Sequence, residues 1–400
     1  MSEMCSNLER HGFVGIDELR DDYSNVCDVI PATHEIARLG RRPVAIQGQP
    51  WQFLDRSLTR DDLYVGWNIK ELYKEGTYGK IFKAFRAFIR RVTEDGREGF
   101  VTASAEALEV VLKQTQPTDG RVTLTAEEVK AHISESLLHV LAWNVLQRTT
   151  MQWAVPRPYE MFGEPSPVVD GAWCSLSLCM DFVKGRTLHA FLETAWRRDT
   201  QRQNAVILLD VLGQTACILY TLQRFLRLNH RDVKDNNLLI RRRDTPVRLR
   251  LGGVELQTPY ELTLIDFGFA CVGCPSPRAP VSAFQASTYF SMREMCCKVG
   301  RDLAQLIFCL HCYFPLQEFL PWELYREVRS WVQVPWNGGT ADLLHGFADE
   351  AGTPRAASVR GAPKYDKGIY EFLRRAEVDA PACEPVRLFA ACCRLKRRFL

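Results

Sequence analysis

A polar run in the middle of the chain, enclosed between two apolar segments, constrains the fold more than any other feature of the sequence. Residues 205–227 before it carry apolar side chains with helical spacing, and residues 238–240 after it are apolar and strand-like. Between them the chain reads Asn-His-Arg-Asp-Val-Lys-Asp-Asn-Asn at residues 229–237. The sequence therefore predicts a helix, a polar loop and a strand, with the loop as the first candidate functional segment.

A second segment adds a carboxylate at the end of another predicted strand. Residues 262–270 read Leu-Thr-Leu-Ile-Asp-Phe-Gly-Phe-Ala, so an apolar strand ends at Asp266 and Gly268. Together the two segments resemble the eukaryotic-type protein kinase family. The second segment matches its D-F-G triplet, and the first matches its H-R-D-x-K-x-x-x-N pattern at His230, Arg231, Asp232, Lys234 and Asn237. Either segment alone could be an ordinary structural turn, so the resemblance rests on both occurring in this order.

The resemblance implies a role for each of these polar residues. Phosphoryl transfer leaves little covalent chemistry to the protein, so positioning and charge neutralisation dominate. Asp232 would be the catalytic carboxylate beside the attacking hydroxyl, and Lys234 would meet the γ-phosphate of ATP. Mg²⁺ prefers oxygen ligands, which Asn237 and Asp266 would supply.

An upstream turn resembles the glycine-rich loop that covers the phosphates in this family. Gly76 and Gly79 fit the second and third glycines of the pattern, and Ile81 fits the valine that packs on adenine. Lys74 stands where the first glycine is expected, which is a departure from the pattern. A Gly-x-x-Gly turn by itself usually only connects two strands, although glycines do let backbone amides approach phosphate closely.

The family also needs a lysine on its third strand and a glutamate on the following helix. Residues 110–113 read Val-Val-Leu-Lys and resemble V-A-I-K, so Lys113 is the candidate for binding the α- and β-phosphates. Lys80 and Lys83 are rivals, but they lie close to the glycines. Glu135 is the first choice for the partner of Lys113, and Glu128 remains an alternative. A lysine at a strand end and a glutamate on a helix can also be merely solvated.

Residues 178–188 resemble the hinge between the two lobes of that fold. By this resemblance Met180 is the gatekeeper, backbone groups from Asp181 to Val183 bind adenine, and Leu239 forms the floor of the pocket. Without the flanking motifs, the same segment would be interpreted as an ordinary strand, turn and helix.

Residues 266–300 would form the activation segment. Arg231 would bind a phosphorylated side chain of this segment through charge-assisted hydrogen bonds. The candidates are Ser276, Ser282, Ser287, Thr288 and Tyr289. The A-P-E triplet of the family is absent. Asp302 resembles the aspartate that opens a large helix and braces the catalytic loop, which is a structural role.

The predicted fold class is α+β, a bilobal protein-kinase-like fold with a small antiparallel β-rich N-lobe carrying one key helix and a larger, mainly helical C-lobe. The expected organisation is an N-terminal extension at 1–62, an N-lobe at 63–180 with an insertion near 90–105, a C-lobe at 181–385 with an inserted hairpin near 241–260, and a basic C-terminal tail at 386–400. The hairpin could be a solvated face or could dock an acidic partner. Its basic residues are Arg241, Arg242, Arg243, Arg248 and Arg250.

Composition excludes several other classes. Lys and Arg number 51 against 48 Asp and Glu, a formal net charge of +3, so nucleic acid is not an expected partner. The first fifteen residues lack the apolar core of a signal peptide. Asp210, Gln214 and Thr215 interrupt the longest apolar stretch, so we expect a buried helix and no transmembrane segment. These features favour an intracellular protein, cytoplasmic or nuclear, with reduced cysteines.

The predicted function is that of a serine/threonine protein kinase that uses ATP and Mg²⁺ and acts on protein substrates. Lys234 in the loop is typical of serine/threonine rather than tyrosine kinases. The insertions and the missing A-P-E triplet resemble divergent kinases of large DNA viruses, which would place the protein in an infected host cell. Two alternatives stay open: a pseudokinase scaffold that binds partners without turnover, which Lys74 and the missing A-P-E triplet favour, and a small-molecule kinase of related fold.

Overall fold

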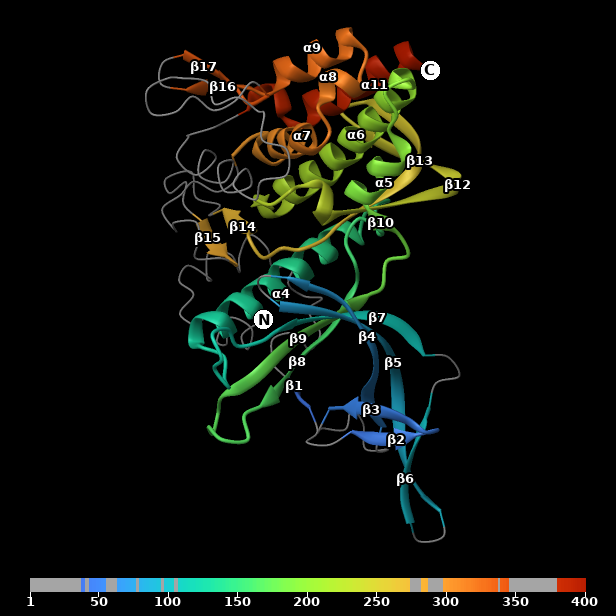
Figure 1. The fold of residues 1–400 in the computed structure, drawn as a ribbon, viewed down its shortest axis with the longest axis vertical. Coiled ribbons are helices and arrows are strands. Elements are labelled where there is room, and N and C mark those ends of the chain that lie inside the picture. Colours follow the sequence, from blue (N-terminus) through green and yellow to red (C-terminus); the bar gives the residue numbers. More distant parts are fainter. Residues whose placement is uncertain are drawn as a thin grey trace. The chain divides into compact units, whose positions relative to one another are not determined.

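The computed structural model describes residues 37–39, 43–54, 63–76, 79–94, 97–103, 107–273, 282–286, 298–336, 339–344 and 380–400. In these ranges the protein is a mixed α+β structure with a curled sheet and several helices (Figure 1). The chain divides into two compact units. Of the described residues, those within 37–140 and 156–183 belong to the first unit, and those within 141–155 and 184–400 belong to the second.

The first unit is built mainly from strands. They are β1 (Ala37–Arg38), β2 (Val44–Ile46), β3 (Gln49–Phe53), β4 (Leu63–Gly76), β5 (Gly79–Glu94), β6 (Arg97–Thr102), β7 (Leu108–Thr115), β8 (Pro158–Pro165) and β9 (Trp173–Asp181). Their order is β1-β8-β9-β7-β5-β4-β3-β2, and β6 pairs with β5 outside this path. Only β1 and β8 are parallel among these pairs. Strands β1 to β3 come from residues 1–62, so part of the expected extension joins the sheet.

Successive side chains along each strand point to opposite faces of the sheet, so one face packs in the core and the other is available to functional side chains. Val110 and Leu112 of β7 are buried in one core, so Lys113, the next residue, points to the opposite face. Trp67 of β4 stacks on Phe162 of β8, with ring centroids 4.1 Å apart. The core consists of Leu39, Leu54, Val65, Trp67, Ala84, Val110, Leu112, Phe162 and Cys179.

Strands β4 and β5 are long enough, at 14 and 16 residues, to carry a second core at their far end. Strands β2, β3 and β6 join them there, and β2 approaches β6 as the sheet curls. The buried residues of this second core are Ile46, Trp51, Tyr64, Ala87 and Ile89, with Phe53, Phe85 and Phe100 packed against them. The insertion expected near 90–105 corresponds to the β5–β6 hairpin.

Helix α4 (Ala126–Leu146) starts in the first unit and ends in the second. A capping box begins it, because the Glu128 amide donates to Thr125 Oγ1 at 3.2 Å and the Thr125 amide donates to Glu128 Oε2 at 2.8 Å. Arg121 Nη2 also donates to Glu128 at 2.7 Å. The side chain of Glu128 is therefore committed to the start of the helix.

The second unit is mainly helical. Its helices are α5 (Leu188–Ala195), α6 (Gln201–Leu226), α7 (Arg301–Tyr313), α8 (Leu316–Phe319), α9 (Trp322–Trp331) and α11 (Pro385–Phe399), with 3-10 turns η1 (Asp235–Asn237) and η2 (Pro381–Cys383). Its strands are β10 (Arg186–Thr187), β11 (Leu228–Asn229), β12 (Leu238–Leu251), β13 (Val254–Leu264), β14 (Cys271–Gly273), β15 (Ser282–Gln285), β16 (Gln333–Trp336) and β17 (Gly339–Asp342). The small sheets are β10-β12-β13, β11-β14-β15 and β16-β17.

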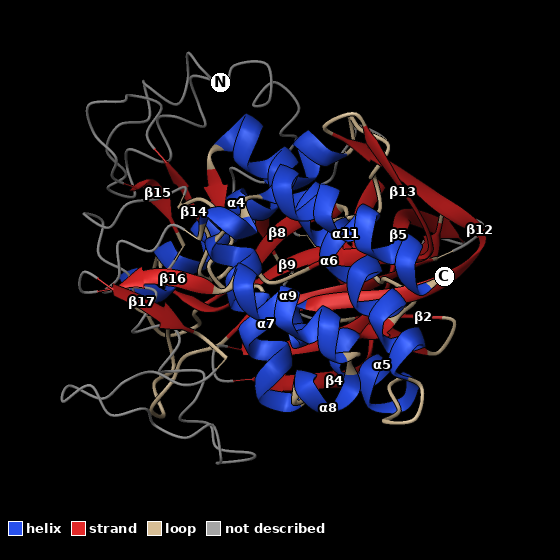
Figure 2. Ribbon diagram, turned by 90° about the horizontal axis from the view of Figure 1, so that it is seen from above, coloured by secondary structure: helices blue, strands red, loops and turns tan. Residues whose placement is uncertain are grey.

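Helix α6 forms the centre of the second unit, where α7 and α11 pack beside it (Figure 2). Among the described residues it alone is long and apolar enough to cross a membrane, and most of its length is buried against neighbouring elements. Arg227 ends the helix in the left-handed conformation, with φ at 47°.

Helix α11, formed by the expected basic tail, packs along α6 and reaches β13. Lys396 Nζ donates to Asp210 Oδ1 of α6 and to the Gln257 carbonyl of β13, both at 2.6 Å. The three elements approach closely at Gly213, where an added Cβ would lie 2.7 Å from Leu256 Cδ2 and 3.6 Å from Cys392 Cβ. The tail is thus an integral part of the core of this unit.

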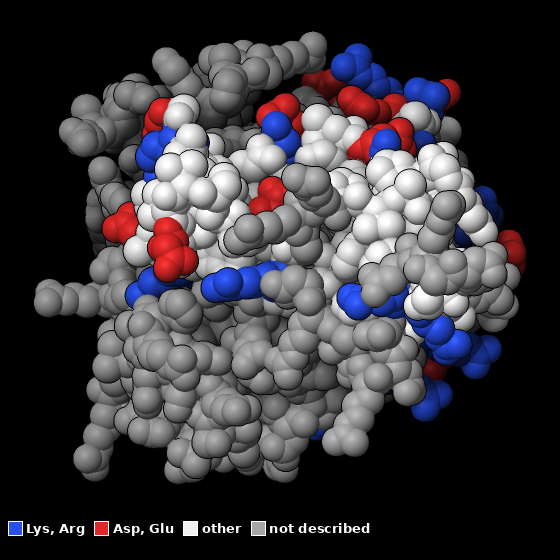
Figure 3. Space-filling view, turned by 90° about the horizontal axis from the view of Figure 1, so that it is seen from below, with Lys and Arg blue, Asp and Glu red and all other residues white. Residues whose placement is uncertain are grey.

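The remaining features of the fold are the distribution of charged side chains on its surface and the state of its cysteines. On the face shown in Figure 3, Lys and Arg side chains lie in small groups with Asp and Glu side chains among them, in keeping with the net charge of +3. Free thiols occur at Cys174, Cys179, Cys217, Cys309, Cys312, Cys383, Cys392 and Cys393. Cys271, in contrast, is disulfide-bonded, so the expectation of uniformly reduced cysteines does not hold there.

Candidate active site

The polar loop between β11 and β12 is held by the first turn of α7. Asp302 accepts two backbone hydrogen bonds, from the amide of His230 at 2.8 Å and from that of Arg231 at 2.9 Å. Arg231 has a φ of 64°, a left-handed conformation that is unfavourable for a residue with a side chain. The two hydrogen bonds that Asp302 accepts offset this strain, which matches the bracing role expected for this aspartate.

The centre of the loop is a buried carboxylate with an amide and an amine around it. Asn237 Nδ2 donates to Asp232 Oδ2 at 2.8 Å and to the Asp232 carbonyl at 3.0 Å. Lys234 Nζ lies 3.2 Å from Asp232 Oδ1. The turn η1 makes this possible, because the Asn237 amide donates to the Lys234 carbonyl at 3.0 Å and folds the asparagine back toward Asp232.

Asp266 lies next to this group through strand pairing. The amide of Ile265 donates to the Asn237 carbonyl at 3.0 Å, and β12 pairs with β13 from Leu238 opposite Leu264. Asp266 also has a left-handed φ, at 70°. Backbone strain of this kind in a non-glycine residue concentrates at functional sites.

The oxygen atoms at this point suit a hard cation. Asn237 uses its Nδ2 group on Asp232, so its Oδ1 faces another way, and the Asp266 carboxylate follows two residues after a strand end. Mg²⁺ takes one or two such ligands and completes its shell with water and phosphate oxygens. In the described part of the chain, no three His, Cys, Asp or Glu side chains are grouped to hold a metal by themselves. Asn237 and Asp266 therefore fit a metal that arrives with a phosphate.

Behind the loop lies an apolar support. The rings of His230 and Phe267 are fully buried, with centroids 4.9 Å apart. Burial lowers the pKa of His230 below its ordinary value, so this imidazole is neutral at pH 7. Arg231 is also fully buried and donates from Nη1 to Gln285 Oε1 at 3.1 Å. Among the expected phosphorylation sites, Ser276, Ser287, Thr288, Tyr289 and the side chain of Ser282 lie outside the described residues.

In the first unit, the expected phosphate-covering turn joins β4 to β5. Gly76 pairs with Gly79 across the turn, and Lys74 is exposed and pairs with Ile81. Gly79 has a φ of 154°, and an added Cβ would lie 2.2 Å from the Gln114 carbonyl oxygen of β7. Only glycine fits this position.

Lys113 forms an ion pair with Glu135 of α4. Strand β7 places the lysine directly opposite Ile81 of β5, on the face away from the core. His132, one turn before Glu135, receives a 2.9 Å hydrogen-bond contact from Thr115 at Nδ1. Burial, assisted by the charge of Lys113, lowers the pKa of His132 to about 3, so it adds no positive charge beside the lysine.

The alternative candidates for the lysine and the glutamate of this ion pair have other partners. Glu128 is engaged by Thr125 and Arg121 at the start of α4. The rival lysines have other glutamate partners: Lys80 with Glu75 at 3.6 Å and Lys83 with Glu109 at 3.1 Å. The structure thus brings Lys113 and Glu135 together and no other pair of these candidates.

The hinge candidates lie at the end of β9, still in the first unit. Met180 is buried and pairs with Val111 of β7. The amide of Asp181 donates to the carbonyl just before β8 at 2.9 Å, and its carboxylate accepts from Tyr159 Oη at 2.5 Å.

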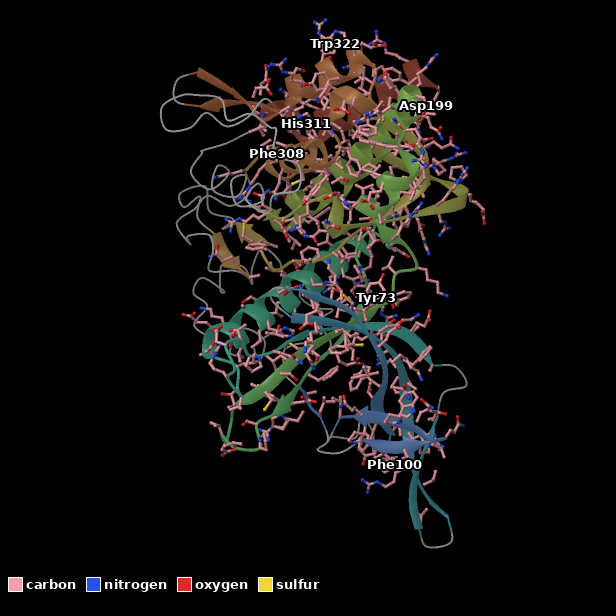
Figure 4. All side chains as sticks on the ribbon, in the orientation of Figure 1. Tyr73, Phe100, Asp199, Phe308, His311 and Trp322 are labelled. Carbon is pink, nitrogen blue, oxygen red and sulfur yellow. The ribbon has the colours of Figure 1, made fainter. Side chains whose placement is uncertain are left out.

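Aromatic contacts fix the residue between Asp181 and Val183. Figure 4 labels Tyr73 of β4, whose ring meets the Phe182 ring edge-on at 6.3 Å. Lys83 Nζ lies 4.6 Å from the centre of the same ring. Leu239 belongs to the second unit, where it is half-buried in β12 between Thr187 of β10 and Thr263 of β13.

Sequence reasoning missed two groups of supporting residues. Tyr159, which fixes Asp181, carries no motif, and burial together with the Asp181 carboxylate raises its pKa. His189 and Asp235 also form a pair beside the loop. The one available signal was an unexplained aspartate, Asp235, inside the polar run.

Comparison with known proteins adds little evidence on the fold or the activity of this chain. No protein-family model matches the chain, and no curated protein matches it. Among solved structures, the chain is similar to the crystal structure of the BubR1 kinase domain, with 14% sequence identity and a TM-score of 0.42 over 99% of this chain and 94% of that chain. A likeness this distant decides neither the fold nor the activity.

Proposed function

We propose that this protein transfers the γ-phosphate of ATP to serine or threonine hydroxyls of protein substrates, with Mg²⁺ as its metal. The observation that carries the proposal is the group formed by Asp232, Lys234 and Asn237. A buried carboxylate is held at 2.8 Å by an amide and lies 3.2 Å from an amine, all within one strained loop.

This geometry suits a residue that orients and deprotonates a hydroxyl. Asn237 donates to one oxygen of Asp232 and so orients the carboxylate, and a positioned base contributes about 10²- to 10⁴-fold to such reactions. Asn237 Oδ1 and the Asp266 carboxylate would hold the magnesium ion, which neutralises phosphate charge when bound. Lys234 would neutralise charge on the transferred group.

The first unit supplies groups suited to the rest of the nucleotide. Lys113, kept extended by Glu135, would bind the α- and β-phosphates under the turn at Gly79. Met180, the backbone from Asp181 to Val183, Ile81 and Leu239 would surround the adenine. These assignments follow the resemblance to protein kinases at the matching positions.

Transfer of radiolabel from ATP tests the proposal. Purified wild-type protein with Mg²⁺ and a generic protein substrate should label serine and threonine, as read by phosphoamino-acid analysis. Asp232→Asn, which keeps the shape of the side chain, should lower the rate about 10²- to 10⁴-fold because the base is lost. Equal labelling by both proteins would reveal a contaminating kinase. Absence of labelling by a folded wild type would overturn the proposal.

A binding scaffold without turnover is the second candidate. Lys74 is the observation that favours it, since an exposed lysine stands where the first glycine of the phosphate-covering loop is expected. The same labelling experiment separates the two functions, because a scaffold shows no transfer while it can still bind ATP. Labelling of metabolites or aminoglycosides alone would instead indicate a small-molecule kinase.

We also propose that the β12–β13 hairpin binds an acidic partner. Ion pairs engage three of its arginines: Arg241 and Arg243 with Glu261, and Arg250 with Glu255. Arg242 and Arg248 are exposed, and neither is in an ion pair within the described residues. A polyglutamate peptide should therefore bind more weakly to R242E/R248E than to wild type, as measured by calorimetry. The exposed Arg387 provides the control R387E; equal weakening by both would contradict a specific site.

A further inference from the structure

A half-buried histidine and a buried aspartate connect helix α5 to the candidate catalytic loop. His189 Nδ1 lies 2.6 Å from Asp235 Oδ2. The Asp235 side chain is 0% exposed, whereas that of His189 is 24% exposed. A carboxylate this deep needs a hydrogen-bonding partner, because burial without one is strongly unfavourable.

Asp235 stands within the turn that builds the proposed active site. It is the first residue of η1, directly after Lys234, and η1 ends at Asn237. Burial raises the pKa of the Asp235 carboxyl, and the hydrogen bond from His189 counteracts this effect. The other carboxylate oxygen accepts from the Asn236 amide at 3.1 Å. His189 is thus the one side chain in the described residues that bonds to this carboxylate, and it secures the turn that orients Asn237.

The imidazole of His189 is itself held in place. Its ring lies edge-on to Tyr313, with centroids 5.0 Å apart, and is tilted against Phe314 at 5.5 Å. Thr187 caps α5 by accepting from the Ala190 amide at 3.2 Å. Glu193, one turn along α5, is the other charged group near the ring, at 3.4 Å from Nε2.

Helix α7 therefore supports the loop from both of its ends. Its first turn carries Asp302, which binds the amides at 230 and 231. Its last residue is Tyr313, which packs on His189 together with Phe314. Figure 4 labels Phe308 and His311 on the stretch of the same helix between these two supports.

We propose that His189 is a positioning residue for phosphoryl transfer, acting through Asp235 on the turn that places Asn237 against Asp232. The inference rests on the proposed function. His189 does not meet the reacting atoms. Its effect is to keep the Asp235 carboxylate bonded, so that the asparagine amide stays on the base and its oxygen stays turned toward the metal position.

His189→Phe is the sharpest test, because it keeps an aromatic ring against Tyr313 and Phe314 while removing the donor to Asp235. Loss of a supporting hydrogen bond of this type costs about 10- to 100-fold in activity, so kcat should fall by that factor. The KM for ATP should change less than kcat, because the groups of the first unit that are proposed to bind the nucleotide are unaltered. His189→Gln, which retains an N–H donor, should recover most of the kcat.

Two further variants separate positioning from general damage. Glu193→Gln removes the weaker partner of the same imidazole and should keep the wild-type kcat. The double variant His189→Phe/Asp235→Asn should be no slower than Asp235→Asn alone, because two residues that act as one unit are not additive. The double variant also tests the proposal if His189→Phe alone folds poorly. The neutral amide that Asp235→Asn introduces does not need the hydrogen bond that His189 donates to the carboxylate.

The outcomes distinguish the two proposals. If wild type transfers phosphate and His189→Phe keeps its kcat within twofold, the inference is wrong and the proposed function stands. Additive losses in the double variant would likewise overturn it. If folded wild type transfers no phosphate, the proposed function fails and the inference fails with it.

Discussion

Single residues in unusual backbone conformations mark the edges of the candidate site. Arg231 and Asp266 both have positive φ angles, at 64° and 70°, and each such conformation costs on the order of 1–3 kcal/mol. Asp302 offsets the first by accepting two amide hydrogen bonds. Backbone strain at two polar positions favours a functional role for this region rather than an ordinary turn.

Gly79 gives a prediction at the residue scale. In Gly79→Ala the new methyl group would meet the Gln114 carbonyl, at 2.2 Å, so the turn between β4 and β5 must shift away from β7. We expect the KM for ATP to rise about tenfold and the melting temperature to fall by several degrees, as expected for alanine at a position that only glycine tolerates. ATP titration and thermal unfolding measure the two effects.

Gly99→Ala is the matched control for this change. The only neighbour of its added Cβ is Val92 Cγ2 at an ordinary 3.8 Å, and its φ is not positive. Neither the KM nor the melting temperature should move. An unchanged KM in Gly79→Ala would show that the turn has no part in nucleotide binding.

Among the secondary-structure elements, α11 has the most unusual attachment. Asp210 is completely buried, and burial raises its pKa to about 6 although Lys396 lies at 2.6 Å. The carboxylate thus resists ionisation in the folded state more than in the unfolded chain. The ion pair is therefore not a large source of stability, because taking the two charges out of water offsets much of their attraction.

A pH dependence of stability follows from Asp210. Because its pKa is about 6 in the folded state and 3.8 in the reference state, its contribution to stability is complete below pH 3.8 and is lost as the pH rises through 6. Two pKa units correspond to about 3 kcal/mol. Relative to Asp210→Asn, wild type should therefore lose about this much free energy of unfolding between pH 4 and pH 7, as measured by urea unfolding. Parallel pH curves for the two proteins would contradict the prediction.

Across the whole molecule, the candidate residues are divided between the two units. Gly79, Lys113 and Glu135 belong to the first, and Asp232 and Asn237 belong to the second. The sequence predicts the polar loop well, because short-range spacing decides which residues share one turn. It also predicts the strand that ends before the second carboxylate, because apolar runs identify buried strands.

Contacts between distant segments could not be predicted in the same way. The choice between Glu135 and Glu128 stayed open, because helical spacing does not tell which glutamate faces β7. The capping interactions of Thr125 and Arg121 decide it in the structure. The His189–Asp235 pair was missed because the two residues are far apart in the chain and neither follows a pattern. The second core of the first unit was missed because β2 and β3 are too short to give a periodic signal.

Strands β4 and β5 pair along most of their length, with register shifts between Ile69 and Glu71 and between Leu72 and Lys74. The same two strands hold the aromatic cluster around Trp51 and Tyr64 and end at the Gly76–Gly79 turn. Because the hydrogen-bonded ladder joins the aromatic end to the turn, we expect a ligand that binds the aromatic end, an antibody for example, to alter the position of the turn through these two strands.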